Sequence, residues 1–181
     1  MAITDVFDSY YEDKRNIVFL RKDYSHIEFE RCKDGSLTFK INKDGKSVYA
    51  HSKYSPVKEA VRFVDGAGMK RDSVFIIFGF GLGHIIRELL KRASQRNFFF
   101  IYEPDSAVFS KIVDEGYCND ILESDNVYIL SDNDVESFRL FLKTYVDEQL
   151  YMRSQTIITP GYDEVYKEEY VEFLKITKSI V

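Results

Sequence analysis

The sequence contains no tryptophan and has only three prolines, nine glycines and two cysteines among its 181 residues. So little glycine and proline excludes collagen-like and linker-like chains. Cys32 and Cys118 are far apart and lack C-x-x-C spacing, so we expect free thiols rather than a disulfide bridge. His26, His51 and His84 are isolated from one another and from cysteine, so the sequence predicts no metal site.

Long apolar runs and basic stretches are also missing. The longest apolar run, Val74–Phe80, is interrupted by Gly79 and is far shorter than the roughly 20 residues that span a bilayer. The first residues, Met1–Asp5, lack the basic head and apolar run of a signal peptide. The net charge is −5 and the isoelectric point about 5.3, with no sizeable basic patch. We therefore expect a cytoplasmic protein with neither a membrane nor a nucleic acid as partner.

Aromatic residues are abundant. The chain has 15 phenylalanines and 13 tyrosines, and 45% of its residues are hydrophobic. Such a composition is that of an ordered globular chain rather than a disordered one. The length suits one domain, or one domain with a small appendage.

Residues 1–54 show the two-residue alternation of half-buried β-strands, interrupted by turns. The turns carry Asp34-Gly35 and Asp44-Gly45, and Asp-Gly is typical of tight hairpins. We expect a small N-terminal β-meander here. Its predicted strands are Ile17–Leu20, His26–Glu30, Leu37–Ile41 and Ser47–His51.

The pattern changes at residue 55, where Ser55 and Pro56 have the character of an N-cap and a first helical residue. From there strands and helices alternate, with predicted strands at Ser73–Phe78, Phe98–Tyr102, Asn126–Leu130 and Gln155–Thr159. Alternation of this kind predicts an α/β fold, a Rossmann-like and mostly parallel sheet with flanking helices, over residues 55–181.

Two helix boundaries and the chain end carry further expectations. Ser131 or Asp132 is predicted to cap the helix after the third strand, and a single helix is predicted from about Asp163 onward. That last helix reaches Val181 without a stop signal, and four strands are fewer than a full doubly wound sheet has. We therefore expect the front part of a longer polypeptide.

A glycine-rich loop follows the first buried strand. Gly79, Gly81 and Gly83 stand where the strand gives way to a helix, so the backbone can approach a ligand and the helix N-terminus can face an anion. Glu103 lies 20 residues further on, at the end of the next strand, where a carboxylate can accept hydrogen bonds from a ribose. Together they predict a nucleoside site.

The loop spacing decides between possible cofactors. The dinucleotide fingerprint requires a glycine at position 84, where this chain has His84. G-x-G-x-G is the variant that S-adenosylmethionine enzymes of the Rossmann-like class use, so that ligand is preferred over NAD. The strand ends in Ile77-Phe78, however, without the acid usual in those methyltransferases. Two alternatives stay open: the loop serves only helix packing, and Glu103 only favours the start of a helix.

Other polar residues are candidates for ligand contacts. His84, in the first turn of its helix, can reach a phosphate or remain a packed or solvated side chain. His51 and Lys53 lie between the meander and the first helix, where they can donate to a phosphate or belong to an ordinary connecting loop. Asp105 is expected to be a helix cap. No nucleophile constellation is visible, so no catalytic residue is predicted.

Three segments together resemble a known family. His51-Ser52-Lys53-Tyr54-x-Pro56-x-x-Glu59-Ala60, Phe78–His84 and Tyr102–Asp105 look like the amino-terminal domain of the motility accessory factor family. These bacterial proteins are implicated in glycosylating flagellin with nonulosonic acids. The resemblance covers roughly residues 15–180 and is most specific in its first segment, since the other two are general to Rossmann-like folds.

The resemblance implies a non-catalytic module of a longer glycosyltransferase-like protein, binding a nucleoside or nucleotide sugar and reaching flagellin through the parent protein. It carries over no catalytic residue, because nothing here corresponds to the family's central transferase domain. The alternative is a small S-adenosylmethionine-dependent methyltransferase. A third reading, a pterin or nucleotide pyrophosphokinase, would need metal-binding acids near the loop, and Asp105 alone does not supply them.

Overall fold

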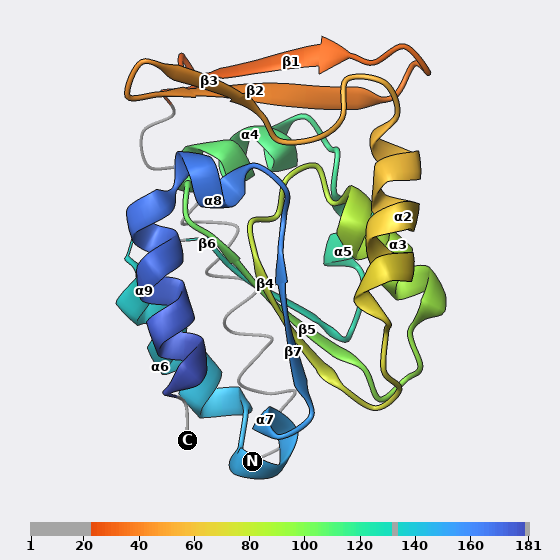
Figure 1. Ribbon diagram of the computed structural model, residues 1–181, viewed down its shortest axis with the longest axis vertical. Helices are drawn as coiled ribbons and strands as arrows, with labels where there is room; N and C mark the ends of the chain where they lie inside the picture. The colour runs from red at the N-terminus through yellow and green to blue at the C-terminus, as the bar shows by residue number, and fades with distance from the viewer. Residues whose placement is uncertain (1–22, 132–133, 180–181) are drawn as a thin grey trace.

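The computed structural model describes residues 23–131 and 134–179, and the predicted strand Ile17–Leu20 lies outside them. Figure 1 shows a parallel sheet between two groups of helices, with a second, smaller sheet across one end. This is the α/β, Rossmann-like fold predicted from the sequence, preceded by an N-terminal meander.

The meander is a three-stranded antiparallel sheet in the order β1-β2-β3. Both Asp-Gly turns form as predicted, and positive φ angles at Asp44 (52°) and Gly45 (73°) suit the tight hairpin between β2 and β3. Residue alternation puts Phe39 and Ile41 in the core. The strands are β1 (Ile27–Arg31), β2 (Leu37–Lys43) and β3 (Lys46–Tyr49).

The larger sheet has four parallel strands in the order β6-β5-β4-β7. All five residues of β4 are buried, which explains the unbroken apolar run of that segment. The chain moves outward from β4 to β6 and then crosses to β7 on the other side, so a topological switch point lies between β4 and β7. The strands are β4 (Val74–Phe78), β5 (Phe98–Glu103), β6 (Val127–Ser131) and β7 (Ser154–Ile158).

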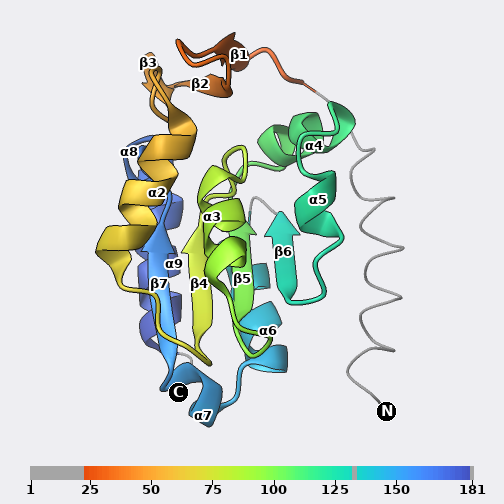
Figure 2. The same ribbon diagram turned by 90° about the vertical axis from the view of Figure 1, so that its right-hand side faces the viewer.

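Helices cover both faces of the parallel sheet. In Figures 1 and 2, α2 and α3 lie together on one face, and α6 and α9 lie together on the other. As predicted, Ser55 caps α2, since its side chain accepts a hydrogen bond from the Lys58 amide, and Pro56 is the first helical residue. The helices are α2 (Pro56–Ala67), α3 (His84–Arg92), α4 (Ser106–Asp114), α5 (Asn119–Leu122), α6 (Val135–Tyr145), α7 (Glu148–Tyr151), α8 (Tyr162–Val165) and α9 (Lys167–Lys178).

Two predicted helix boundaries are wrong. Ser131 ends β6, Asp132 lies outside the described residues, and α6 is capped by Asp134, whose side chain accepts from the Glu136 amide. The final helix is split into α8 and α9, because Tyr166 between them has φ −109° and ψ 52°, outside the helical region. The split makes α8 a separate short element.

The meander lies across the carboxyl ends of the parallel strands (Figures 1 and 2). Side chains of the α/β part reach it from several helices. His84 of α3 is 3.0 Å from the Leu37 carbonyl oxygen, Lys111 of α4 donates to the carbonyl of Ile27, and Lys43 pairs with Glu169 of α9. The meander therefore covers the edge at which ligands bind in this fold class.

Candidate functional site

The glycine loop has the backbone geometry that its sequence requires. Gly79, Gly81 and Gly83 all have positive φ angles, of 86°, 55° and 74°, which side chains larger than hydrogen disfavour. The loop runs from the end of β4 to the start of α3, and Gly83 is the N-cap residue of that helix. Three glycines are thus needed for one sharp strand-to-helix connection.

The loop amides bond to side chains of the same chain. Phe80 N–H donates to Glu103 Oε2 at 2.9 Å, Gly81 N–H to the Tyr162 hydroxyl at 3.1 Å, and Leu82 N–H to His51 Nε2 at 2.9 Å. In this structure these donors, predicted to face a ligand, are satisfied internally.

Glu103 lies at the end of β5, as predicted, and is completely buried. Its Oε2 accepts from Tyr162 as well as from Phe80, and its Oε1 accepts from the amide of Asp105 at 3.1 Å. Burial raises the pKa of this carboxyl group to about 8, and the nearby Asp105 adds to the rise. Glu103 is therefore a carboxyl group whose charge is suppressed around neutral pH.

Tyr162 occupies the space beside the glycines. It is the first residue of α8 and is fully buried, and a Cβ placed on Gly79 would lie 2.5 Å from its ring. Its hydroxyl bridges Gly81 N–H and Glu103 Oε2. Sequence reasoning missed it, although the switch point between β4 and β7 brings the segment after β7 beside the glycine loop.

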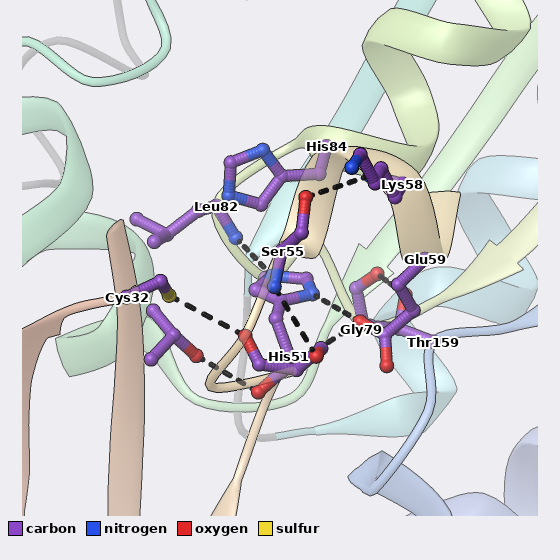
Figure 3. Close-up of polar contacts among 12 residues, drawn as sticks. Cys32, His51, Ser55, Lys58, Glu59, Gly79, Leu82, His84 and Thr159 are labelled. Atoms are coloured by element: carbon purple, nitrogen blue, oxygen red, sulfur yellow. Dashed lines mark hydrogen bonds and ion pairs between the residues drawn. The ribbon is translucent and has the colours of Figure 1, made fainter. Parts of the chain in front are cut away.

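His51 reaches the loop, but not in its predicted role. Its ring points at the Leu82 amide (Figure 3), and because Nε2 accepts that hydrogen bond the proton sits on Nδ1. Burial lowers the pKa of His51 to about 3, so the ring is neutral. A Cβ on Gly81 would be 2.5 Å from Nε2. The predicted phosphate donor is thus an acceptor for the backbone.

The other two candidates, His84 and Lys53, have their partners on the meander. His84 Nε2 lies 3.0 Å from the Leu37 carbonyl oxygen and ties α3 to the meander. Lys53 lies with its ammonium over the Tyr49 ring and 3.7 Å from a Glu30 carboxylate oxygen, and its role in substrate binding stays a prediction. These partners hold Lys53 on the meander, and its side chain is half exposed.

Asp105 extends the polar cluster toward the meander. Its Oδ1 accepts from the amides of Ala107 and Val108, which confirms the predicted helix cap. Its Oδ2 accepts from the Tyr166 hydroxyl and faces His26 Nε2, both at 2.8 Å. Two adjacent carboxyl groups, on Glu103 and Asp105, thus receive one tyrosine hydroxyl each.

Within residues 23–131 and 134–179, no group of three or more histidine, cysteine, aspartate or glutamate side chains could hold a metal ion. No helix there is long and apolar enough to cross a membrane. Surface hollows occur between α6 and α9 and between the meander and α2.

Comparison with known proteins gives matches among solved structures alone. No family model and no curated protein matches the chain. MnmC2 from Aquifex aeolicus matches with a TM-score of 0.50 at 14% identity, over 99% of this chain and 69% of that one. Fibrillarin from Aeropyrum pernix, with natively bound S-adenosyl-L-methionine, matches with a TM-score of 0.37 at 13% identity over 83% and 84% of the two chains. A fibrillarin in complex with Nop5p gives 0.32 at 12% identity, over 76% and 82%.

These comparisons correct the function that the sequence resemblance implied. The fold is shared with MnmC2, and no family model or curated protein links the chain to a flagellin-modifying glycosyltransferase. The prediction of a nonulosonic acid transfer module acting on flagellin is therefore wrong, and the nucleotide sugar ligand tied to it is not retained. The resemblance to the motility accessory factor family itself stays a prediction.

Proposed function

We propose that this chain binds S-adenosylmethionine at the carboxyl ends of β4 and β5, in the manner of Rossmann-like methyltransferases. The observation that carries the proposal is that a hydroxyl group already sits between Glu103 and the Gly81 amide. A ribose hydroxyl makes the same demands, because it donates one hydrogen bond and accepts another.

The residues that would hold the nucleoside come from neighbouring elements. Glu103 would accept from the ribose, and the backbone of Gly79 would lie against it in the space that the Tyr162 ring now fills. Bound S-adenosylmethionine supplies a methyl group on a sulfonium, ready for transfer to a nucleophile. The proposal gives this chain the tasks of binding and orienting that donor.

The fold supports the same reading. The MnmC2 match extends over nearly the whole chain, meander included. In open parallel sheets ligands bind beyond the carboxyl ends of the strands near a switch point. The glycine loop after β4, the acid after β5 and the segment after β7 meet at that place.

Binding is tested by calorimetric and thermal-shift titration of the whole chain with S-adenosylmethionine and S-adenosylhomocysteine. At a ligand concentration 100 times the dissociation constant, binding adds about 2.7 kcal/mol of stability. For a chain of this size we expect the melting temperature to rise by about 5–10 °C. Absence of both heat and shift with either compound would refute the proposal.

Glu103→Gln tests the ribose contact, and we expect it to weaken binding at least tenfold. An amide offers one acceptor oxygen where the carboxyl group now serves three donors, namely the Phe80 and Asp105 amides and the Tyr162 hydroxyl. Glu88→Gln is the matched control, since Glu88 is a largely buried glutamate of α3 paired with Arg92. Equal weakening by both variants would argue against a role for Glu103 in binding.

A further inference from the structure

Tyr162 belongs to α8, a helix of four residues, and the backbone leaves the helical conformation at both of its ends. Gly161 before α8 is in the left-handed region, with φ 83°, and Tyr166 after it leaves the helical region. Two backbone hydrogen bonds, from Val165 to Gly161 and from Tyr166 to Tyr162, close the single turn. An isolated turn has little stability of its own, so tertiary contacts must hold α8 in place.

Those contacts converge on the Tyr162 side chain. The ring packs edge-on against Phe78 at the end of β4, with centroids 6.3 Å apart, and lies beside the ring of Tyr166. The hydroxyl has one bond to Glu103 and one from Gly81. Tyr162 thus anchors α8. It also fills the glycine cradle, which is the space beside Gly79 and the Gly81 amide.

The hydrogen bonds of Tyr162 to Glu103 and the Gly81 amide favour replacement of the tyrosine hydroxyl by a ligand hydroxyl. If Tyr162 left with nothing in its place, a buried carboxyl group and a buried amide would both lose a partner, which is costly. A ribose hydroxyl arriving at the same point would restore both bonds. Removal of the tyrosine and entry of the ligand are therefore coupled, and neither is favourable alone.

We infer that Tyr162 is an intramolecular competitor for the nucleoside site, and that α8 swings out of the glycine cradle when the ligand binds. The inference rests on the proposed function. Competition explains why Tyr162 fills the cradle in this structure, and α8 is the element that must move for the ligand to enter. Because α8 contacts β3, and a Cβ added to Gly161 would lie only 2.9 Å from the Tyr49 carbonyl oxygen, movement of α8 also loosens its contact with β3.

Tyr162→Phe separates competition from packing, since the ring is kept and only the hydroxyl is lost. Without the hydroxyl, Glu103 and the Gly81 amide each lose the hydrogen bond to Tyr162 in the free protein and regain an equivalent bond from the ligand. We expect S-adenosylmethionine to bind about tenfold more tightly than to the unchanged chain, equivalent to about 1.4 kcal/mol.

Tyr166→Phe is the matched control. It also removes a tyrosine hydroxyl bonded to a carboxylate, in the residue that follows α8, but that hydroxyl bonds to Asp105 and does not touch the glycine loop. We expect its affinity for S-adenosylmethionine to stay within about twofold of the unchanged chain. A gain in affinity shared by both variants would overturn the inference.

Hydrogen exchange gives a readout that does not depend on affinity. On addition of S-adenosylmethionine to the unchanged chain, the amides of Val165 and Tyr166 should exchange faster, because the α8 turn opens, while the loop amides stay protected. The inference would be overturned if Tyr162→Phe bound S-adenosylmethionine with the same affinity as the unchanged chain and the hydrogen exchange of the α8 amides did not change on binding. The proposed function would then remain intact. Failure of every variant to bind S-adenosylmethionine would overturn both.

Discussion

Gly79→Ala should destabilise the protein by about 3 kcal/mol or more, because two costs add at this position. The φ of 86° is unfavourable for any residue with a Cβ. The new methyl group would also lie 2.5 Å from Cδ1 and Cγ of Tyr162, in a ring that is fully buried and cannot yield without moving α8. Urea unfolding of the variant and the unchanged chain measures the loss directly.

Gly45→Ala is the control that separates backbone strain from steric conflict. Gly45 also has a positive φ, of 73°, but nothing lies within 4 Å of a Cβ added there. We expect a loss of about 1–2 kcal/mol, which is the backbone cost alone. If the two variants lose the same stability, Tyr162 does not press on the glycine loop in solution, and the filled cradle described here is wrong.

The stability of the protein should fall as pH rises from about 6.5 to 8. The pKa of Glu103 is raised from 4.5 to about 8 by burial, so over this range the folded chain holds a proton that the unfolded chain has lost. Stability then decreases with pH by about 1.4 kcal/mol per unit, which gives about 2 kcal/mol over this interval. Glu103 of the folded chain is half ionised at about pH 8, so the loss is complete only about one pH unit higher.

His51 acts in the opposite direction at lower pH. Burial lowers its pKa from 6.5 to about 3, so between these values the unfolded chain binds a proton that the folded chain does not. Its contribution to stability is therefore complete above pH 6.5 and is lost as pH falls toward 3. Between pH 4.5 and 6.5 the effects of Glu103 and His51 oppose each other, and we expect a plateau.

Chemical denaturation at intervals between pH 5 and 9 measures the plateau and the decline that follows it. Glu103→Gln should abolish the decline above pH 6.5, since the amide does not titrate. Glu88→Gln should leave the decline in place, because the partners of Glu88 lower its pKa rather than raise it. A decline of the same slope in Glu103→Gln would show that another group is responsible.

Local patterns were sufficient for the secondary structure of most of the chain. The apolar run of β4 and the Asp-Gly turn at Asp44 and Gly45 are dictated by burial and by turn geometry, and both form where expected. Two expectations failed where local signals were weak or equivalent. The run Ser131-Asp132-Asn133-Asp134 contains only residue types that can cap a helix, and nothing in the sequence marks the break at Tyr166.

Only part of the candidate site could be predicted from the sequence. Gly79, Gly81, Gly83 and Glu103 are close together because consecutive strands of a parallel sheet end at the same edge, and that can be inferred from their order along the chain. Tyr162 lies 59 residues beyond Glu103 and meets it only because β7 returns to the far side of β4. A contact between such distant segments has no signature in spacing.

The α/β class, the main strands and helices in their chain order, and the glycine loop could all be predicted from the sequence, since each depends on periodicity or on residues that few conformations accept. What the loop faces depends on the tertiary structure. Packing of the meander and of α8 over the carboxyl edge brings His51 and Tyr162 to the loop amides. The physical reason is that buried amides must find partners, and which side chain supplies them depends on the packing of distant elements.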